Sequence, residues 1–305
     1  MPQKSGLPND LRTLPTAIIA QGAGIGIMVA LPLLNWVIVN YSWHWAFGVL
    51  GFAGLAWAAA WLVLGREGSL TTATSTDPTL RPDRIAYRQL LLSPTIIAAW
   101  CAGFAAYWGL SQALSWQGAF LIKGLGFAQS SIGLLGALPA ATSAILVIAA
   151  GWVSQRLLAR GVSSRLARGI FSGACVALGG TAMAIMPYVA SIPGKVALTT
   201  IGVAVPSVIY VIGSAVVSEI APVAQRGAVL AIGTAVATSA GLLAPYVMGS
   251  VVETAATPLA GFNTGFMICG VIMLVGGIIG TALMRPERET TRWASEMPEA
   301  AVGPA

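Results

Sequence analysis

The stretch "FNTGFMICGVIMLVGGIIGTALM", residues 262–284, contains no charged side chain. A helix of about 20 apolar residues crosses the roughly 30 Å hydrocarbon core of a bilayer. The whole 305-residue chain is 56% hydrophobic and only 9% charged, whereas about a quarter of the residues in soluble domains are charged. We therefore predict a transmembrane helix at 262–284 and a chain that lies mostly in a membrane.

Seven further stretches of this kind recur along the chain, so we predict eight transmembrane helices. The eight predicted helices comprise residues 17–39, 46–64, 95–121, 131–153, 169–190, 196–217, 227–252 and 262–284. The runs are long and uniformly apolar, unlike the short alternating segments of membrane strands. The predicted fold class is all-α, a polytopic membrane protein whose main partner is the lipid bilayer.

The basic residues are distributed unevenly between the two sides that eight crossings define. Of the sixteen Lys and Arg, only Lys123 and Lys195 fall on one side. Basic residues accumulate in cytoplasmic loops, so we predict a multi-pass protein of the cell (inner) membrane with both termini cytoplasmic. The net charge of +6 then follows from topology, and we predict no nucleic-acid partner.

A basic loop follows the predicted span 131–153. It is contained in "GWVSQRLLARGVSSR", residues 151–165. The glycines and the polar or basic residues of this loop include Gly151, Gln155, Arg156, Arg160, Gly161 and Arg165.

The chain also contains a weak internal repeat. Phe47, Gly51 and Arg66 match Phe266, Gly270 and Arg285 at a constant offset of 219 residues. The last two spans would then complete a six-helix bundle, residues 95–285. Residues 1–65 would be the last two helices of a preceding bundle whose first four helices the chain lacks, 66–94 a cytoplasmic linker and 286–305 a cytoplasmic tail.

These features resemble the major facilitator superfamily, whose members consist of two six-helix bundles joined by a cytoplasmic linker. The loop 151–165 resembles the superfamily's cytoplasmic loop signature, except that Gln155 stands where the motif usually has Asp, which leaves Arg156 without its carboxylate partner. Five stretches resemble the organic-anion symporter branch in particular: "YSWHWAF" (41–47), "LGREG" (64–68), "SEIAPVAQRG" (218–227), "AGLLAP" (240–245) and "RPER" (285–288).

The resemblance implies secondary active transport of a small organic anion, such as a carboxylate or sugar acid, together with protons. It also places the first and fourth helices of the bundle, spans 95–121 and 196–217, along the central cavity. Both carry a polar stripe at helical spacing. The candidate substrate-binding residues are Trp108, Gln112, Ser115 and Trp116 in one span, and Ser207, Tyr210 and Ser214 in the other. Helix packing is the alternative role for these polar side chains.

Other residues have structural interpretations. Glu219 and Arg226 flank the turn between two spans, and we predict an ion pair between them. The glycine pairs Gly22/Gly26, Gly169/Gly173 and Gly276/Gly280 predict close helix approach.

No acidic or basic residue lies in the middle of a predicted span. We therefore predict neither an enzyme nor a cofactor or metal site, and we expect the chain by itself to be an incomplete, non-transporting fragment. Two alternatives stay open: a non-transporting membrane partner or regulator, and a membrane-embedded enzyme.

Overall fold

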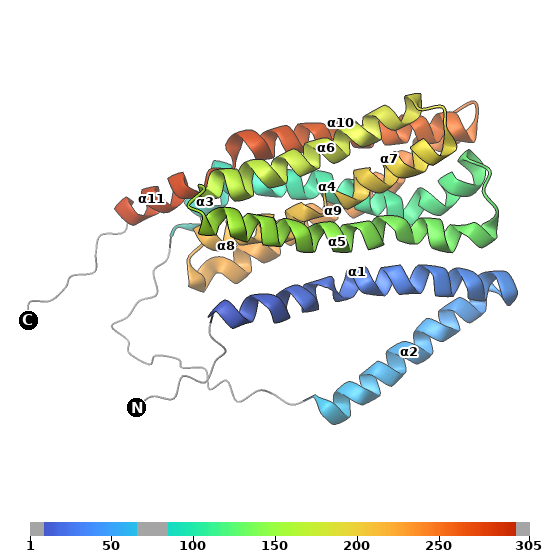
Figure 1. Cartoon of the computed structure of the whole chain (residues 1–305), viewed down its shortest axis with the longest axis horizontal. Helices are drawn as coiled ribbons and strands as arrows, with labels where there is room; N and C mark the ends of the chain where they lie inside the picture. Colours follow the sequence, from blue (N-terminus) through green and yellow to red (C-terminus); the bar gives the residue numbers. More distant parts are fainter. Residues whose placement is uncertain (1–8, 66–84, 297–305) are drawn as a thin grey trace, which may run out of the picture. The chain divides into compact units, whose positions relative to one another are not determined.

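The computed structural model describes residues 9–65 and 85–296, with side chains described at Gly22 and from Ile25 to Trp293 within these ranges. These residues form helices joined by short turns (Figure 1). The long helices are α1 Asn9–Asn40, α2 Trp43–Leu64, α4 Pro94–Ala119, α5 Ile132–Ala159, α6 Phe171–Ile185, α7 Ile192–Ala204, α8 Val208–Ile220, α9 Val223–Thr254 and α10 Pro258–Leu283. Shorter elements are α3 Tyr87–Leu91, α11 Pro286–Glu296, the π-helical segments η1 Phe120–Gly124 and η3 Arg165–Ile170, and the 3-10 helices η2 Gln129–Ser131 and η4 Met186–Tyr188. The all-α prediction is confirmed.

The chain divides into two compact units. The first contains α1, α2 and the segment Ala128–Ala137 at the beginning of α5. Asn35 of α1 joins this segment: its amide donates to the Gln129 carbonyl oxygen and accepts from the Gln129 amide, both at 3.1 Å. Within this unit, most apolar side chains of α2 are exposed.

The second unit contains the remainder of α5 and all later helices, together with α3, α4 and η1. Its core is built from alanines, methionines and aromatic side chains. Phe120, Phe262 and Phe266 pack edge to face, with ring centroids 5.5 and 4.8 Å from Phe120. This cluster fixes the end of α4 against α10.

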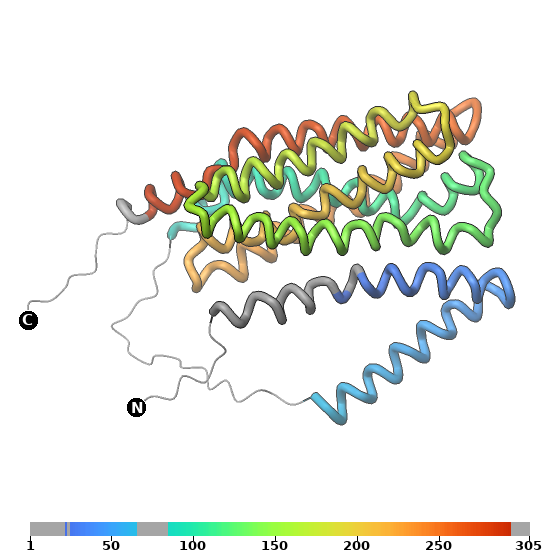
Figure 2. Tube along the Cα trace, in the orientation of Figure 1, coloured from blue at the N-terminus to red at the C-terminus, as the bar shows by residue number. Residues whose placement is uncertain are grey.

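Helices α6 and α10 lie side by side and make the most extensive helix contact in this unit (Figure 2). Glycines allow the two backbones to touch. A Cβ atom on Gly180 would lie 2.6 Å from the Leu274 nitrogen and 2.8 Å from the Gly270 oxygen. Gly173 likewise faces Gly280, where a Cβ atom would lie 2.9 Å from the carbonyl carbon. No larger residue fits at these positions without moving a helix.

The glycine predictions are confirmed in part. Gly169 and Gly173 face α10 or its end, and Gly276 faces Ala105 of α4. At Gly22 and Gly26, no described atom lies within 4 Å of the position of an added Cβ atom, so close helix approach at this pair stays a prediction.

Six helical segments in the described part of the chain are long and apolar enough to cross a membrane. They are Trp43–Leu64, Gln129–Ala159, Arg165–Tyr188, Ile192–Ile220, Val223–Thr254 and Pro258–Leu283. The other two predicted spans correspond to α4, which contains several polar side chains, and to α1, whose side chains are described without a break only over Ile25–Asn40. The predicted division into residues 1–65, 66–94, 95–285 and 286–305 stays a prediction; 66–84 and 297–305 lie outside the described residues.

The structure places Lys195 in a helix, whereas the sequence analysis places it in a loop between two predicted spans. It lies in the first turn of α7, is 6% exposed, and donates to the carbonyl oxygens of Met186 and Pro187, each at 3.2 Å. These carbonyls lie in η4, which ends the preceding helical segment, and the Met186 oxygen also accepts from the Val189 backbone N–H at 3.2 Å. The ammonium group therefore satisfies a helix C-terminus, where a positive charge is favourable.

Candidate functional site

The predicted polar stripe of α4 faces its helix neighbours more than solvent. Trp108 and Gln112 are buried, and the Gln112 amide donates to the Met248 sulfur of α9 at 3.9 Å. The Trp116 indole donates to the Pro245 carbonyl oxygen, also on α9, at 3.1 Å. These contacts give the stripe a packing role, and its contact with substrate stays a prediction. Ser115 is exposed.

The contact between α4 and α9 is built around a proline. Pro245 lies inside α9 and has no N–H to donate to the Gly241 carbonyl oxygen one turn earlier. The hydroxyl of Ser111 donates to that oxygen instead, at 3.4 Å. Polar side chains of a neighbouring helix commonly satisfy such freed groups in membrane proteins. Sequence reasoning missed Ser111, although the spacing of Gly241 and Pro245 indicates a carbonyl in need of a donor.

The predicted residues of α8 fall into three environments. Tyr210 is half-buried and packs edge-on against Tyr107 of α4, with ring centroids 6.4 Å apart. Ser207 is buried, and Ser214 is exposed with its hydroxyl donating to the Val211 carbonyl oxygen at 2.8 Å. The aromatic pair Tyr107–Tyr210 therefore connects the two candidate helices. Tyr107, next to the predicted Trp108, is a second residue that sequence reasoning missed.

The predicted span 196–217 is interrupted between α7 and α8, at Val205–Ser207. Pro206 cannot donate to the helical ladder, and its ring occupies the space left by the missing side chain of Gly179 on α6. Ser207 donates to the Ala204 carbonyl oxygen at 2.6 Å and accepts from the Ser143 hydroxyl of α5 at 2.7 Å. Interrupted membrane helices expose backbone polar groups and often adjoin binding sites.

The loop motif forms the end of α5 and the turn that follows it. Gly161 has a φ of +79°, a conformation that glycine adopts without strain. The Gly161 N–H donates to the Leu158 oxygen and the Val162 N–H to the Leu157 oxygen, both at 3.0 Å. This pair of bonds is the Schellman arrangement that ends a helix. The motif glycine is therefore required by the backbone.

The other motif residues lie along the end of α5 and its turn. Gln155, Arg156 and Arg160 are exposed, whereas the Arg165 Nε atom is buried without a hydrogen-bond partner among the described residues. Arg156 places its guanidinium 4.0 Å from the ring centroid of Trp152, one turn earlier. This cation–π contact gives Arg156 a neighbour that the sequence analysis did not foresee.

Replacing Gly161 by alanine is expected to lower the free energy of unfolding by about 1 kcal/mol, because an L-residue is strained at positive φ. Gly151→Ala, in the same helix and with open space around its Cα atom, is expected to be neutral or stabilising. Thermal unfolding of both purified variants in one detergent measures the difference. Equal stability of the two variants would show that the turn tolerates a side chain.

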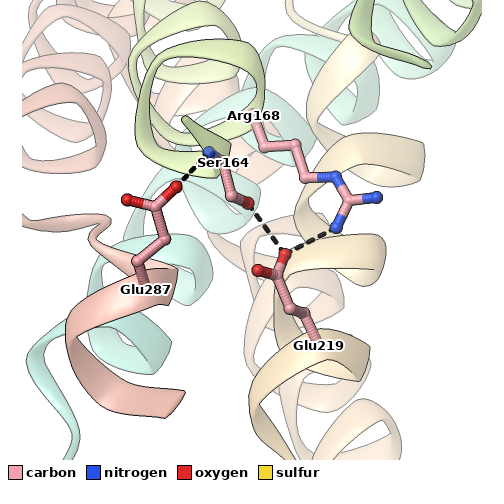
Figure 3. Close-up of polar contacts among 4 residues, drawn as sticks. All are labelled: Ser164, Arg168, Glu219 and Glu287. Atoms are coloured by element: carbon pink, nitrogen blue, oxygen red, sulfur yellow. Dashed lines mark hydrogen bonds and ion pairs between the residues drawn. The ribbon is translucent and has the colours of Figure 1, made fainter. Parts of the chain in front are cut away.

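The predicted ion pair between Glu219 and Arg226 is wrong: Glu219 pairs with Arg168, at 2.5 Å between Oε2 and Nη1. The Ser164 hydroxyl donates to the same carboxylate oxygen at 2.8 Å. The beginning of η3 therefore presents two donors to Glu219 (Figure 3). The Arg226 Nε atom is buried without a hydrogen-bond partner among the described residues.

A second carboxylate completes this cluster, which we call the loop cluster: Ser164, Arg168, Glu219 and Glu287. Glu287, in the first turn of α11, accepts from the Ser164 backbone N–H. Figure 3 shows Ser164 between the two carboxylates, which come from α8 and α11. Three elements that are distant in sequence are thus joined at one end of the second unit.

Comparison with known proteins assigns this helical architecture to a protein family. The model of the Major Facilitator Superfamily matches residues 7–206, about two thirds of the chain. The chain belongs to this superfamily. The resemblance inferred from the sequence is thereby confirmed, and with it the prediction of a multi-pass membrane protein that is not an enzyme.

Relatives of this superfamily member are named as transporters. The hexuronate transporter of Bacillus subtilis is 21% identical over 288 residues, which cover 92% of this chain and 67% of that protein. The D-galactonate transporter of Escherichia coli O6:H1 is 23% identical over 54% of this chain and 43% of its own length. The chloroplastic sodium-dependent phosphate transport protein 1 of Arabidopsis thaliana is 27% identical over 52% of this chain. The match spans about a third of that protein's length.

A solved structure shows the same fold. It is a bacterial homologue of the human lysosomal transporter Spinster, in an inward-facing and unoccupied conformation, with a TM-score of 0.58 and 16% sequence identity. The alignment covers 92% of this chain and 67% of that one.

Proposed function

We propose that this chain is part of a secondary active transporter that carries a small organic anion, such as a carboxylate or sugar acid, together with protons. The observation that carries the proposal is the match to a hexuronate transporter over 92% of the chain, within a superfamily to which the chain belongs. The D-galactonate transporter points to the same substrate class, since both named substrates are sugar acids.

The second unit supplies groups suited to such a substrate. Tyr107 and Tyr210 meet between α4 and α8, and the helix break at Val205–Ser207 lies in the same helical span as Tyr210. Tyrosine combines an apolar ring with a hydroxyl that binds carboxylate or hydroxyl oxygens. We therefore assign the substrate-binding role first to Tyr210 and Gln112, with Trp108, Trp116, Ser115, Ser207 and Ser214 as further candidates.

Binding tests this assignment directly. Purified protein is titrated with labelled galactonate and glucuronate, and Tyr210→Phe and Gln112→Leu are expected to weaken binding about tenfold, as the loss of one hydrogen bond to a charged ligand does. Tyr246→Phe is the matched control, because Tyr246 lies on α9 and is 75% exposed. Equal affinity in all variants, or no binding of either acid, would contradict the assignment.

We also propose that the 305-residue chain does not transport by itself. Among the described residues, the first unit contains α1, α2 and the beginning of α5, whereas alternating access requires two bundles to rock against each other. Proteoliposomes that contain this polypeptide are expected to take up no labelled acid, with or without an inward proton gradient. Uptake driven by the gradient would overturn this proposal and support proton coupling.

The proposed location is the cell membrane, with both termini in the cytoplasm. The support is the concentration of basic residues on one side of the predicted spans. Cysteine introduced at Ser163, in the turn before η3, is expected to react with a membrane-impermeant maleimide only after cells are opened. Labelling in intact cells would reverse the orientation.

A further inference from the structure

A cavity of about 490 Å³ opens in the second unit where α4 begins and α10 ends. Its walls are formed by the first two residues of α4, by Leu283 and by four charged residues. Arg285, Arg288 and Arg292 contribute three guanidinium groups, against the single carboxylate of Glu289. Even without Arg292, Arg285 and Arg288 outnumber the single carboxylate among the described wall residues, so the wall carries excess positive charge.

The arginines occupy one side of a short helix. Arg285 directly precedes α11, and Arg288 and Arg292 follow at intervals of three and four residues, the spacing of neighbours on a helix surface. Glu289, the acidic residue among the described wall residues, is 5% exposed and accepts from the Trp293 indole at 3.2 Å. Its single negative charge offsets one positive charge, so Arg285 and Arg288 together with Glu289 still carry a net charge of +1.

Backbone contacts hold this group against the beginning of α4. The Thr95 hydroxyl accepts from the Arg285 backbone N–H at 3.1 Å and donates to the Leu283 carbonyl oxygen at 3.4 Å. Pro94 and Thr95, the first residues of the 26-residue helix α4, both line the cavity. The first turn of a helix has free N–H groups and a positive dipole end, so α4 adds to the field of the arginines.

We infer that this cavity binds the phosphate group of an anionic molecule. Guanidinium groups form paired hydrogen bonds with phosphate oxygens, and a helix N-terminus favours the same anion. The cavity lies beside Leu283, the last residue of a membrane-length apolar segment, which is the depth of lipid headgroups. The phosphate can come from an anionic phospholipid or from a soluble phosphate compound.

The test uses the full 305-residue chain purified in detergent. Native mass spectrometry measures binding of added phosphatidylglycerol and phosphatidylcholine, and calorimetry measures binding of inorganic phosphate. The cavity variant is Arg285→Gln with Arg288→Gln. The matched control is Arg156→Gln with Arg160→Gln, which removes the same charge from exposed positions at the end of α5. A third variant, Arg285→Lys with Arg288→Lys, keeps the charge.

Phosphatidylglycerol is expected to bind about tenfold more tightly than phosphatidylcholine, and the cavity variant to lose this preference while the control keeps it. The lysine variant is expected to retain part of the affinity, which separates lost charge from lost folding. If inorganic phosphate displaces the lipid, the phosphate group bound by the cavity can belong to a soluble compound. If inorganic phosphate does not displace the lipid, the ligand is the phospholipid. Equal losses in cavity and control variants, equal binding of the two lipids, or no binding of either phosphate probe would overturn the inference.

This inference does not depend on the transported substrate. Galactonate and glucuronate contain no phosphate, and the cavity variant leaves Tyr210 and Gln112 unchanged. Loss of lipid binding with normal binding of sugar acids, or the reverse, therefore distinguishes failure of one proposal from failure of the other.

Discussion

Gly180→Ala is expected to lower the free energy of unfolding by about 3 kcal/mol, the upper range for overpacked sites. The new methyl group would meet backbone atoms on α10: the Leu274 nitrogen at 2.6 Å, the Gly270 oxygen at 2.8 Å and the Met273 carbonyl carbon at 2.9 Å. Backbone atoms cannot change rotamer, so the helices α6 and α10 must move apart. Thermal or denaturant unfolding in detergent measures the loss.

The matched control is Gly227→Ala, an exposed position in α9 with open space around its Cα atom. There the same substitution is expected to stabilise by up to about 1 kcal/mol, because alanine favours the helix more than glycine does. The two substitutions thus have opposite signs. Similar effects in both variants would show that backbone contact between α6 and α10 does not determine stability.

A double-mutant cycle of Arg168→Gln and Glu219→Gln is expected to give a coupling energy of about 1–2 kcal/mol. The two side chains are 24% and 25% exposed, so solvent screens their attraction only in part. Glu219 also accepts from Ser164. Replacing Glu219 alone is therefore expected to destabilise more than replacing Arg168 alone, because two donors lose their acceptor.

A parallel cycle of Arg226→Gln and Glu219→Gln is the control. The structure pairs Glu219 with Arg168, so this second coupling energy is expected to be close to zero. A coupling between Glu219 and Arg226 as large as that with Arg168 would contradict the structure and restore the pairing expected from their proximity in sequence.

Much of the fold follows from local hydrophobicity, because the bilayer imposes nearly the same length on every crossing helix. The predicted span 46–64 and helix Trp43–Leu64 have the same last residue, and 262–284 differs from Pro258–Leu283 only at its ends. The interruption of 196–217 was missed. A hydropathy average over about 20 residues is hardly changed by the single residue Pro206. Only the fit of this proline against Gly179 shows why the helix breaks there.

The candidate site was less predictable for a different reason. Helical spacing places Trp108 and Gln112 on one face of α4, but the identity of the helix that covers this face is not encoded in the spacing. Likewise, Glu219 and Arg226 are close in sequence, yet the better donors to Glu219 come from residues 164 and 168. Partner choice across helices depends on tertiary contacts.

The glycine contact between α6 and α10 has a mechanical consequence. Where two backbones touch directly, no side chains lie between them that could rearrange. We therefore expect α6 and α10 to move together as one rigid body. The span Ile192–Ile220 is different, because its hydrogen-bond ladder is interrupted at Val205–Ser207. Any bending within the second unit during a transport cycle is therefore expected at this hinge, directly before the helix that carries Tyr210.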